Sequence, residues 1–165
     1  MTATLLEVPW SDARAVALRD AMNVETGAMY AQFMADRTPE QQAATDAALT
    51  VDSATITYTV IALEGETPVA HAALRPVVTG SIAGALEVKK VFVAPSARGT
   101  GLSRRIMADL EAVARERGVT RLVLQTGPLQ VAAIALYEHI GYEAIPVFGA
   151  YAAVPGALCF GKTLA

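Results

Sequence analysis

The sequence has a single cysteine, Cys159, among 165 residues. One thiol cannot build a disulfide framework or a cysteine-based zinc cluster within the chain, and apolar neighbours favour a buried structural role for it. The net charge of −3 disfavours a globally basic nucleic-acid-binding protein. No apolar run approaches the ~20 residues that span a bilayer, and residues 1–10 lack the features of a secretory signal. We therefore expect a cytoplasmic protein with no metal, no membrane partner and no nucleic-acid partner.

Apolar residues make up 53% of the chain, which suffices for a core, and the length fits one domain over residues 1–165. Ser11 stands where a helix N-cap is expected, and residues 38–51 are compatible with a helix or a loop. The patterns predict helices over 11–22, 24–35, 98–118 and 129–140, and strands over 54–63, 69–77, 86–93, 121–125, 143–148 and 157–163. Hairpins followed by a strand–helix–strand crossover predict an α/β chain with a mixed sheet flanked by helices, in which strands 86–93 and 121–125 run parallel.

The junction between the strand 86–93 and the following helix contains two glycines, Gly99 and Gly101. The first N–H groups of a helix lack internal partners and attract anions, and glycine lets a ligand approach the backbone closely. Three arginines, Arg98, Arg104 and Arg105, add positive charge, with no acidic residue between positions 94 and 107. The loop matches neither a P-loop nor a dinucleotide fingerprint. On these residues alone, an anion site and an ordinary surface turn are equally good interpretations.

A second signature follows in residues 130–142, where Tyr137 stands four residues before the pair Gly141-Tyr142. Together the two segments resemble the GNAT family of N-acetyltransferases, and the resemblance is close from about residue 86 to residue 142. It implies the acyl-CoA N-acyltransferase fold, with a mostly antiparallel sheet, and acetyl-CoA as a co-substrate. Relatives often dimerise, so a homodimer is also an expectation.

The resemblance assigns a cofactor-binding role to two stretches and one further side chain. The pantetheine arm would pair with the strand, and backbone N–H groups of the loop would hold the pyrophosphate. Gln130 stands where asparagine is usual, and Ser103 where glycine or alanine is usual. The implied cofactor-binding residues are Val91, Phe92, Val93, Arg98, Gly99, Thr100, Gly101, Leu102, Ser103, Arg104 and Gln130.

Tyr137 resembles the general acid that protonates the departing CoA thiolate. The alternative is a core tyrosine, because apolar residues share its helix face. Some members of the family use a glutamate base at the position that Gln125 holds here, and an amide cannot serve in that way. Glu87 is the other candidate base, with a strand-end ion pair to Lys89 as its alternative. His71 could also line the substrate side.

These residues imply an N-acetyltransferase that moves an acetyl group from acetyl-CoA to a primary amine of a small molecule, amino acid or peptide. The transfer would be a direct attack in a ternary complex. A non-catalytic acyl-CoA-binding module of the same fold is the alternative, and a plain α/β interaction domain is a third hypothesis. Acidic residues such as Glu25, Asp36 and Glu40 would suit a cationic amine or form a solvated face.

Overall fold

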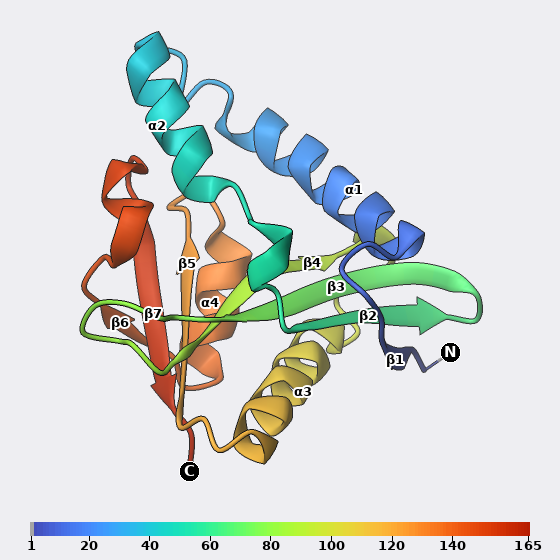
Figure 1. Ribbon diagram of the computed structural model, residues 1–165. Helices are drawn as coiled ribbons and strands as arrows, with labels where there is room; N and C mark the ends of the chain where they lie inside the picture. The colour runs from blue at the N-terminus through green and yellow to red at the C-terminus, as the bar shows by residue number, and fades with distance from the viewer. Residues whose placement is uncertain (1) are drawn as a thin grey trace.

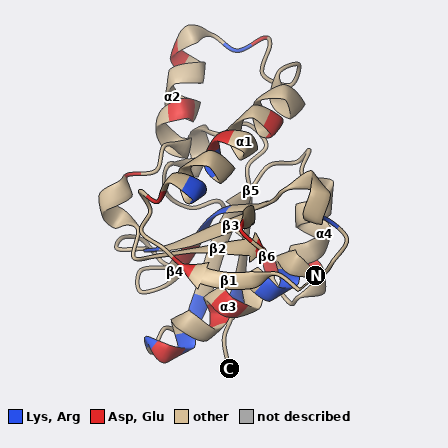
Figure 2. Ribbon diagram, turned by 90° about the vertical axis from the view of Figure 1, so that its right-hand side faces the viewer, with Lys and Arg blue, Asp and Glu red and all other residues tan. Residues whose placement is uncertain are grey.

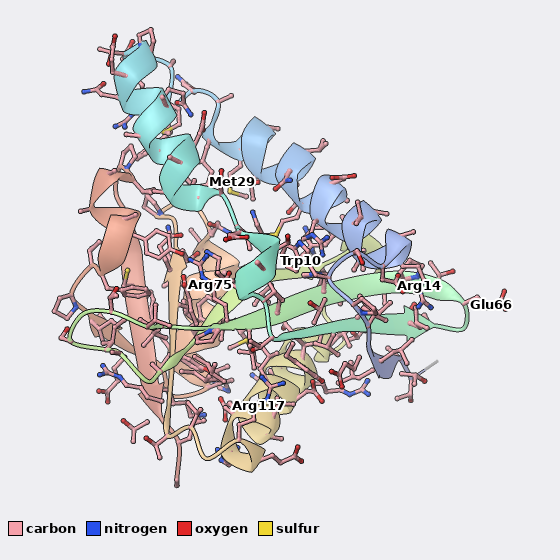
Figure 3. All side chains as sticks on the ribbon, in the orientation of Figure 1. Trp10, Arg14, Met29, Glu66, Arg75 and Arg117 are labelled. Atoms are coloured by element: carbon pink, nitrogen blue, oxygen red, sulfur yellow. The ribbon has the colours of Figure 1, made fainter. Side chains whose placement is uncertain are left out.

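A single twisted sheet of seven strands organises the protein (Figure 1). The computed structural model describes residues 2–165. Neighbouring strands are antiparallel except for the β4–β5 pair, and the order across the sheet is β1-β2-β3-β4-β5-β7-β6. The strands are β1 (Thr4–Glu7), β2 (Tyr58–Glu64), β3 (Thr67–Pro76), β4 (Leu86–Val93), β5 (Arg121–Thr126), β6 (Glu143–Ile145) and β7 (Leu158–Thr163). The β2–β3 hairpin projects outward, with Glu66 at its tip (Figure 3).

Helices cover both faces of the sheet. α1 (Ala13–Tyr30) and α2 (Pro39–Leu49) lie on one side, and α3 (Leu102–Glu116) lies on the other (Figure 1). α4 (Val131–His139) packs against the same core cluster as α3. α3 has the clearest amphipathic pattern, and it buries Ile106, Met107 and Leu110 completely. α2 carries only acidic charge (Figure 2).

The strands β4 and β5 separate almost as soon as they meet. Their parallel pairing consists of two residue pairs, Leu86 with Leu122 and Glu87 with Val123. Beyond these pairs β5 continues beside β7, while β4 runs on beside β3 (Figure 1). The edge of β4 that faces β5 therefore keeps its backbone groups available, and the core of the sheet opens into a gap.

A β-bulge interrupts β4 next to this gap. Ala73 pairs with Lys89 and His71 pairs with Phe92, so one residue of β3 faces two residues of β4. Lys90 has a φ of 55°, and it is the one non-glycine residue with positive φ in the part of the chain that the structure describes. Such strain in a lysine needs support from its surroundings.

Most of the predicted elements are confirmed, including the mixed, mostly antiparallel sheet and the parallel β4–β5 pair. The two helices expected over 11–22 and 24–35 are instead one helix, α1, and its N-cap is Asp12, not Ser11. Residues 38–51 contain α2, which begins with a capping box between Thr38 and Gln41. The strand expected over 54–63 begins only at Tyr58, after a 3₁₀ turn, and β1 was not predicted.

Two further observations concern the described residues 2–165 as a whole. None of their helices combines the length and hydropathy that crossing a bilayer requires. Within the same range, no three His, Cys, Asp or Glu side chains gather in a way that could hold a metal ion.

The end of α1 is attached to the turn between β5 and α4 through Tyr30. The hydroxyl of Tyr30 accepts a hydrogen bond from the Leu129 N–H at 3.1 Å. It also lies 1.9 Å from the point where a Cβ on Gly127 would stand. The tyrosine ring packs edge-on against Phe33, with 5.8 Å between the ring centroids. Glycine is therefore required at position 127 by the close approach of α1.

We predict that Gly127→Ala lowers the free energy of unfolding by about 1–3 kcal/mol, because the Tyr30 ring must move away. Gly27→Ala is the matched control. A Cβ at Gly27 meets no atom within 4 Å, and alanine in a helix interior gains up to about 1 kcal/mol over glycine. Urea denaturation of both variants measures the effect. Equal stability changes in the two variants would contradict the packing described.

Candidate active site

A groove of about 500 Å³ follows the gap between β4 and β5. One wall is β4 and the opposite wall combines β5 with α4. The groove extends to the beginning of α3. Apart from Thr100 and Arg104, every residue that the sequence assigned to cofactor binding lines this groove: Val91, Phe92, Val93, Arg98, Gly99, Gly101, Leu102, Ser103 and Gln130.

The loop before α3 presents a row of free backbone donors. Gly99 and Gly101 both adopt left-handed φ, 78° and 79°, and Gly101 is the N-cap of α3. Within residues 2–165, no N–H group from Gly99 to Arg104 donates a hydrogen bond, and the first bond of the helix runs from the Arg105 N–H to the Gly101 carbonyl. The first turn contains no acidic residue and the N-cap contributes no side chain. This end of α3 therefore fits a phosphate-type anion.

The three arginines near this loop do not act together. Arg98 forms an ion pair with Glu25 of α1 at 2.7 Å, and its Nε donates to the Val93 carbonyl. Arg105 turns away and donates to the Ala3 carbonyl. Arg104 is exposed and makes no side-chain hydrogen bond to any described residue. The partner of Arg98 lies 73 residues away in the sequence, so the sequence did not indicate it.

Residues 91–93 form the last part of β4 and pair with β3 on one side only. Phe92 is buried against the α1 side of the sheet, while Val91 and Val93 pack toward the α3 side. Their backbone groups on the other edge face the gap that β5 leaves. An extended chain such as a pantetheine arm could pair with that edge in the manner of an added strand.

Two glutamine side chains lie at the end of the groove that is away from α3. Gln130 accepts hydrogen bonds from the Gly127 N–H at 3.0 Å and the Thr126 hydroxyl at 3.2 Å, which leaves its amide N–H₂ available. Gln125 donates to the Thr126 carbonyl. Both line the groove and also a second cavity beside it.

Tyr137 lies in the groove wall. The residue is 6% exposed, and among residues 2–165 its hydroxyl finds no hydrogen-bond partner, although its ring packs with Tyr142 and Phe160. Burial raises the pKa of the Tyr137 hydroxyl, so this group is protonated at neutral pH. Tyr137 thus belongs to the core and also lines the groove, with a hydroxyl that is protonated at neutral pH.

The second cavity, of about 400 Å³, lies between the sheet and the helices α1 and α2. We call it the acceptor cavity. It shares Met22, Thr26, Lys90, Gln125 and Gln130 with the groove, so the two spaces meet at these residues. The acidic residues that the sequence suggested for an amine pocket do not line it: Glu25 pairs with Arg98, and Asp36 and Glu40 lie outside the cavity wall. Its one carboxylate is Asp46 of α2.

Glu87 lies in a buried ion cluster next to the acceptor cavity. Its carboxylate accepts from Arg75 at 2.7 Å, from the Tyr151 hydroxyl, and from Lys89 at 3.4 Å. Lys89 also donates to the Tyr151 hydroxyl at 2.6 Å. Burial lowers the pKa of Lys89 to about 8, although Glu87 opposes the shift. Glu87 itself lines neither space, and the pairing with Lys89 that the sequence offered as an alternative is present.

His71 supports the bulge from the α1 side of the sheet. Its Nδ1 lies 2.8 Å from the Lys90 carbonyl and its Nε2 lies 3.0 Å from the Arg19 guanidinium. Since Arg19 can only donate, Nε2 accepts and Nδ1 carries the proton. Arg19 also stacks on Trp10, 3.6 Å from the ring centroid, on the α1 side of the sheet (Figure 3). His71 is completely buried and lines neither the groove nor the acceptor cavity.

The sequence model of the acetyltransferase (GNAT) family matches residues 18–142. The chain belongs to the GNAT family. Among solved structures, a candidate acyl-CoA N-acyltransferase from Klebsiella pneumoniae is 27% identical, with a TM-score of 0.74 and 99% of each chain covered. A paia N-acetyltransferase from Thermoplasma acidophilum, solved with coenzyme A, shares the GNAT fold at 12% identity, a TM-score of 0.66 and 99% coverage of each chain.

Curated relatives of this GNAT chain match over a shorter segment. An IAA acetyltransferase from Azospirillum brasilense is 41% identical over 78 residues, which are 47% of this chain and 51% of the relative. The uncharacterised N-acetyltransferase YjgM of Escherichia coli K12 is 39% identical over 88 residues, or 53% and 52% of the two chains. The matched segments span about half the length of these relatives.

We predict that His71 makes the stability of this GNAT domain pH-dependent. Burial lowers the pKa of His71 from 6.5 to about 4. Between these values the unfolded chain binds a proton that the folded chain does not. The stabilisation is therefore fully present above pH 6.5 and lost as the pH falls toward 4, by an amount on the order of 3 kcal/mol.

Thermal unfolding of the wild type and of His71→Gln between pH 7 and pH 4.5 measures this difference. Glutamine can keep both hydrogen bonds but does not titrate, so the variant should show a shallower decrease in Tm. His139→Gln, at an exposed helix end, is the control and should follow the wild type. Parallel curves for wild type and His71→Gln would refute the assignment.

Proposed function

We propose that this chain is an acetyl-CoA-dependent N-acetyltransferase acting on a primary amine by direct transfer in a ternary complex. The observation that carries the proposal is the row of unpaired N–H groups from Gly99 to Arg104, at the end of a strand whose edge is open. The names of the relatives, which are acetyltransferases, agree with this activity.

In the proposed arrangement the groove holds acetyl-CoA and the acceptor cavity holds the amine. The pyrophosphate binds at the start of α3, where helix dipole and free N–H groups both favour an anion. The pantetheine arm follows residues 91–93 of β4 toward Lys90 and Gln125, where groove and acceptor cavity meet. The free amide N–H₂ of Gln130 is available to the same arm, which keeps the contact that asparagine would make.

Tyr137 supplies the proton in the proposed reaction. The amine nitrogen attacks the thioester carbonyl carbon, the C–S bond breaks, and the Tyr137 hydroxyl protonates the leaving sulfur. Burial raises the pKa of the Tyr137 hydroxyl above its ordinary value, which makes donation to the thiolate uphill, because a thiol has a pKa of only about 8.5. The step balances when the proton that the amine loses passes to the Tyr137 oxygen, directly or through water, as the sulfur takes the hydroxyl proton.

Glu87 stays a predicted base that acts indirectly. Because its carboxylate lines neither space, it can reach the acceptor only through Lys89 or through a water. Gln125, at the position of a glutamate in some relatives, lines both spaces but does not accept a proton. An amine that arrives unprotonated would need no base from the protein.

We predict that Ser103→Asp weakens acetyl-CoA binding at least about 10-fold, because a carboxylate at the start of α3 competes with the pyrophosphate. The same carboxylate favours the helix, so the free variant should melt at the wild-type temperature or above. A ligand at 100 times its Kd stabilises a fold by about 2.7 kcal/mol, so the rise in Tm with acetyl-CoA measures binding. Ser103→Ala is the control and should keep the rise. No rise in the wild type at saturating acetyl-CoA would refute the proposal.

We predict that Tyr137→Phe lowers kcat by about 10²–10⁴-fold with little change in acetyl-CoA affinity or stability, since the hydroxyl has no partner among the described residues. Thiol release with a panel of amines measures turnover. Tyr142→Phe is a matched control, because Tyr142 also carries a buried hydroxyl with no hydrogen-bond partner within residues 2–165 but does not line the groove. Unchanged turnover in Tyr137→Phe would remove Tyr137 from the mechanism. Binding of acetyl-CoA without turnover of any amine would favour the non-catalytic module.

A further inference from the structure

The acceptor cavity is lined by more positive than negative charge. Among the described residues, those of its wall that carry charge at neutral pH are Lys89 and Lys90 of β4 and Asp46 of α2. Asp46 is on the exposed side of the cavity and already accepts a hydrogen bond from Gln42 at 2.8 Å. A site for a purely cationic amine would be expected to show the opposite balance.

The two lysines differ in how far their charge is compensated. Lys89 has Glu87 and the Tyr151 hydroxyl as partners. The Lys90 ammonium has no hydrogen-bond or ion-pair partner among residues 2–165, and burial together with Arg19 lowers its pKa. An anion from outside the chain would therefore be its natural partner.

The backbone of Lys90 is fixed by a chain of specific contacts. The residue occupies the bulge with its φ of 55°, and its carbonyl is held by His71, which in turn is held by Arg19. These contacts bind the backbone and leave the side chain free. The residue lines both the groove and the acceptor cavity, so in the proposed arrangement Lys90 stands where the acetyl group and the amine would meet.

Away from this point, the wall of the acceptor cavity combines an apolar part with polar side chains of α1 and α2. Met22 and Tyr30 of α1, Met34, and Leu49 of α2 contribute to its wall. An acceptor that places an anion at Lys90 and its amine at the thioester must carry both groups close together. Its remaining atoms then extend into the apolar part of the cavity.

Resting on the proposed function, we infer that the acceptor is an α-amino acid or an amine of the same design, whose carboxylate is bound by Lys90 and whose apolar side chain fills the acceptor cavity. Lys90 is thus a specificity-determining residue. It selects acceptors that carry a carboxylate on the carbon atom next to the amine.

The test compares acceptors that differ only in the carboxylate. Phenylalanine, leucine and methionine are assayed against their carboxamides and their decarboxylated amines, with thiol release from acetyl-CoA as the readout. For the wild type we expect kcat/KM to be at least about 10-fold higher for the amino acids, as a charge-assisted hydrogen bond provides. Lys90→Met should remove this preference, mainly through KM, and Lys90→Arg should retain part of it.

Two controls separate this inference from the proposed function. The rise in Tm with acetyl-CoA reports cofactor binding in every variant, and its absence in the wild type would refute the proposed function itself. Arg14→Met removes a remote positive charge, paired only with Asp12, and should leave the preference unchanged.

With cofactor binding intact, three results would overturn the inference. The first is equal kcat/KM for amino acids and decarboxylated amines. The second is an equal decrease for both in Lys90→Met. The third is no turnover of any of the twenty common amino acids.

Discussion

The separation of β4 from β5 after two paired residues is the constraint on which the rest of this protein depends. A parallel pair that continued would bury the backbone edge of β4 and close the core. Because the strands part at Glu87 and Val123, a groove penetrates the sheet between α1 and α4. The groove extends from the open edge of β4 to the first turn of α3. Backbone groups of a strand edge and unpaired N–H groups of a helix end therefore face the same groove.

Two clusters of polar side chains stabilise the strands on either side of this opening, at two different places along β4. Near its closed end, Glu87 gathers Arg75, Lys89 and Tyr151, which joins β3 and β4 to the segment before β7. On the α1 side, Arg19 and His71 hold the bulged backbone. Buried charge of this kind is costly unless it is paired. Arg75, Glu87, Arg19 and His71 lie outside both spaces, whereas the paired Lys89 and Lys90, which has no partner among the described residues, line the acceptor cavity.

How much the sequence could predict depends on the range of the interactions involved. α3 and the hairpin follow from local periodicity, and the loop before α3, with its unpaired N–H groups, follows from Gly99 and Gly101. The four residues of β1 are too few for a pattern, and its strand exists because it pairs with β2. The break that the sequence predicts within α1 falls at Asn23, a weak helix former, but the helix continues through this residue. The pairs Arg98–Glu25 and Glu87–Tyr151 span 73 and 64 residues, and no local pattern encodes them.

The way the acceptor cavity is assembled bears on how the protein could change its substrate. Met34, Leu49, Val154 and Pro155 touch that cavity alone, on segments outside the sheet, whereas Lys90 and Gln125 also face the groove. Under the proposed function, substitutions in the first set would reshape the acceptor cavity without altering residues that line the groove. Laboratory evolution directed at residues 34–49 and 154–155 would therefore vary the shape of the acceptor cavity while the groove stays unchanged. Relatives that differ at these positions would differ in acceptor before they lost activity.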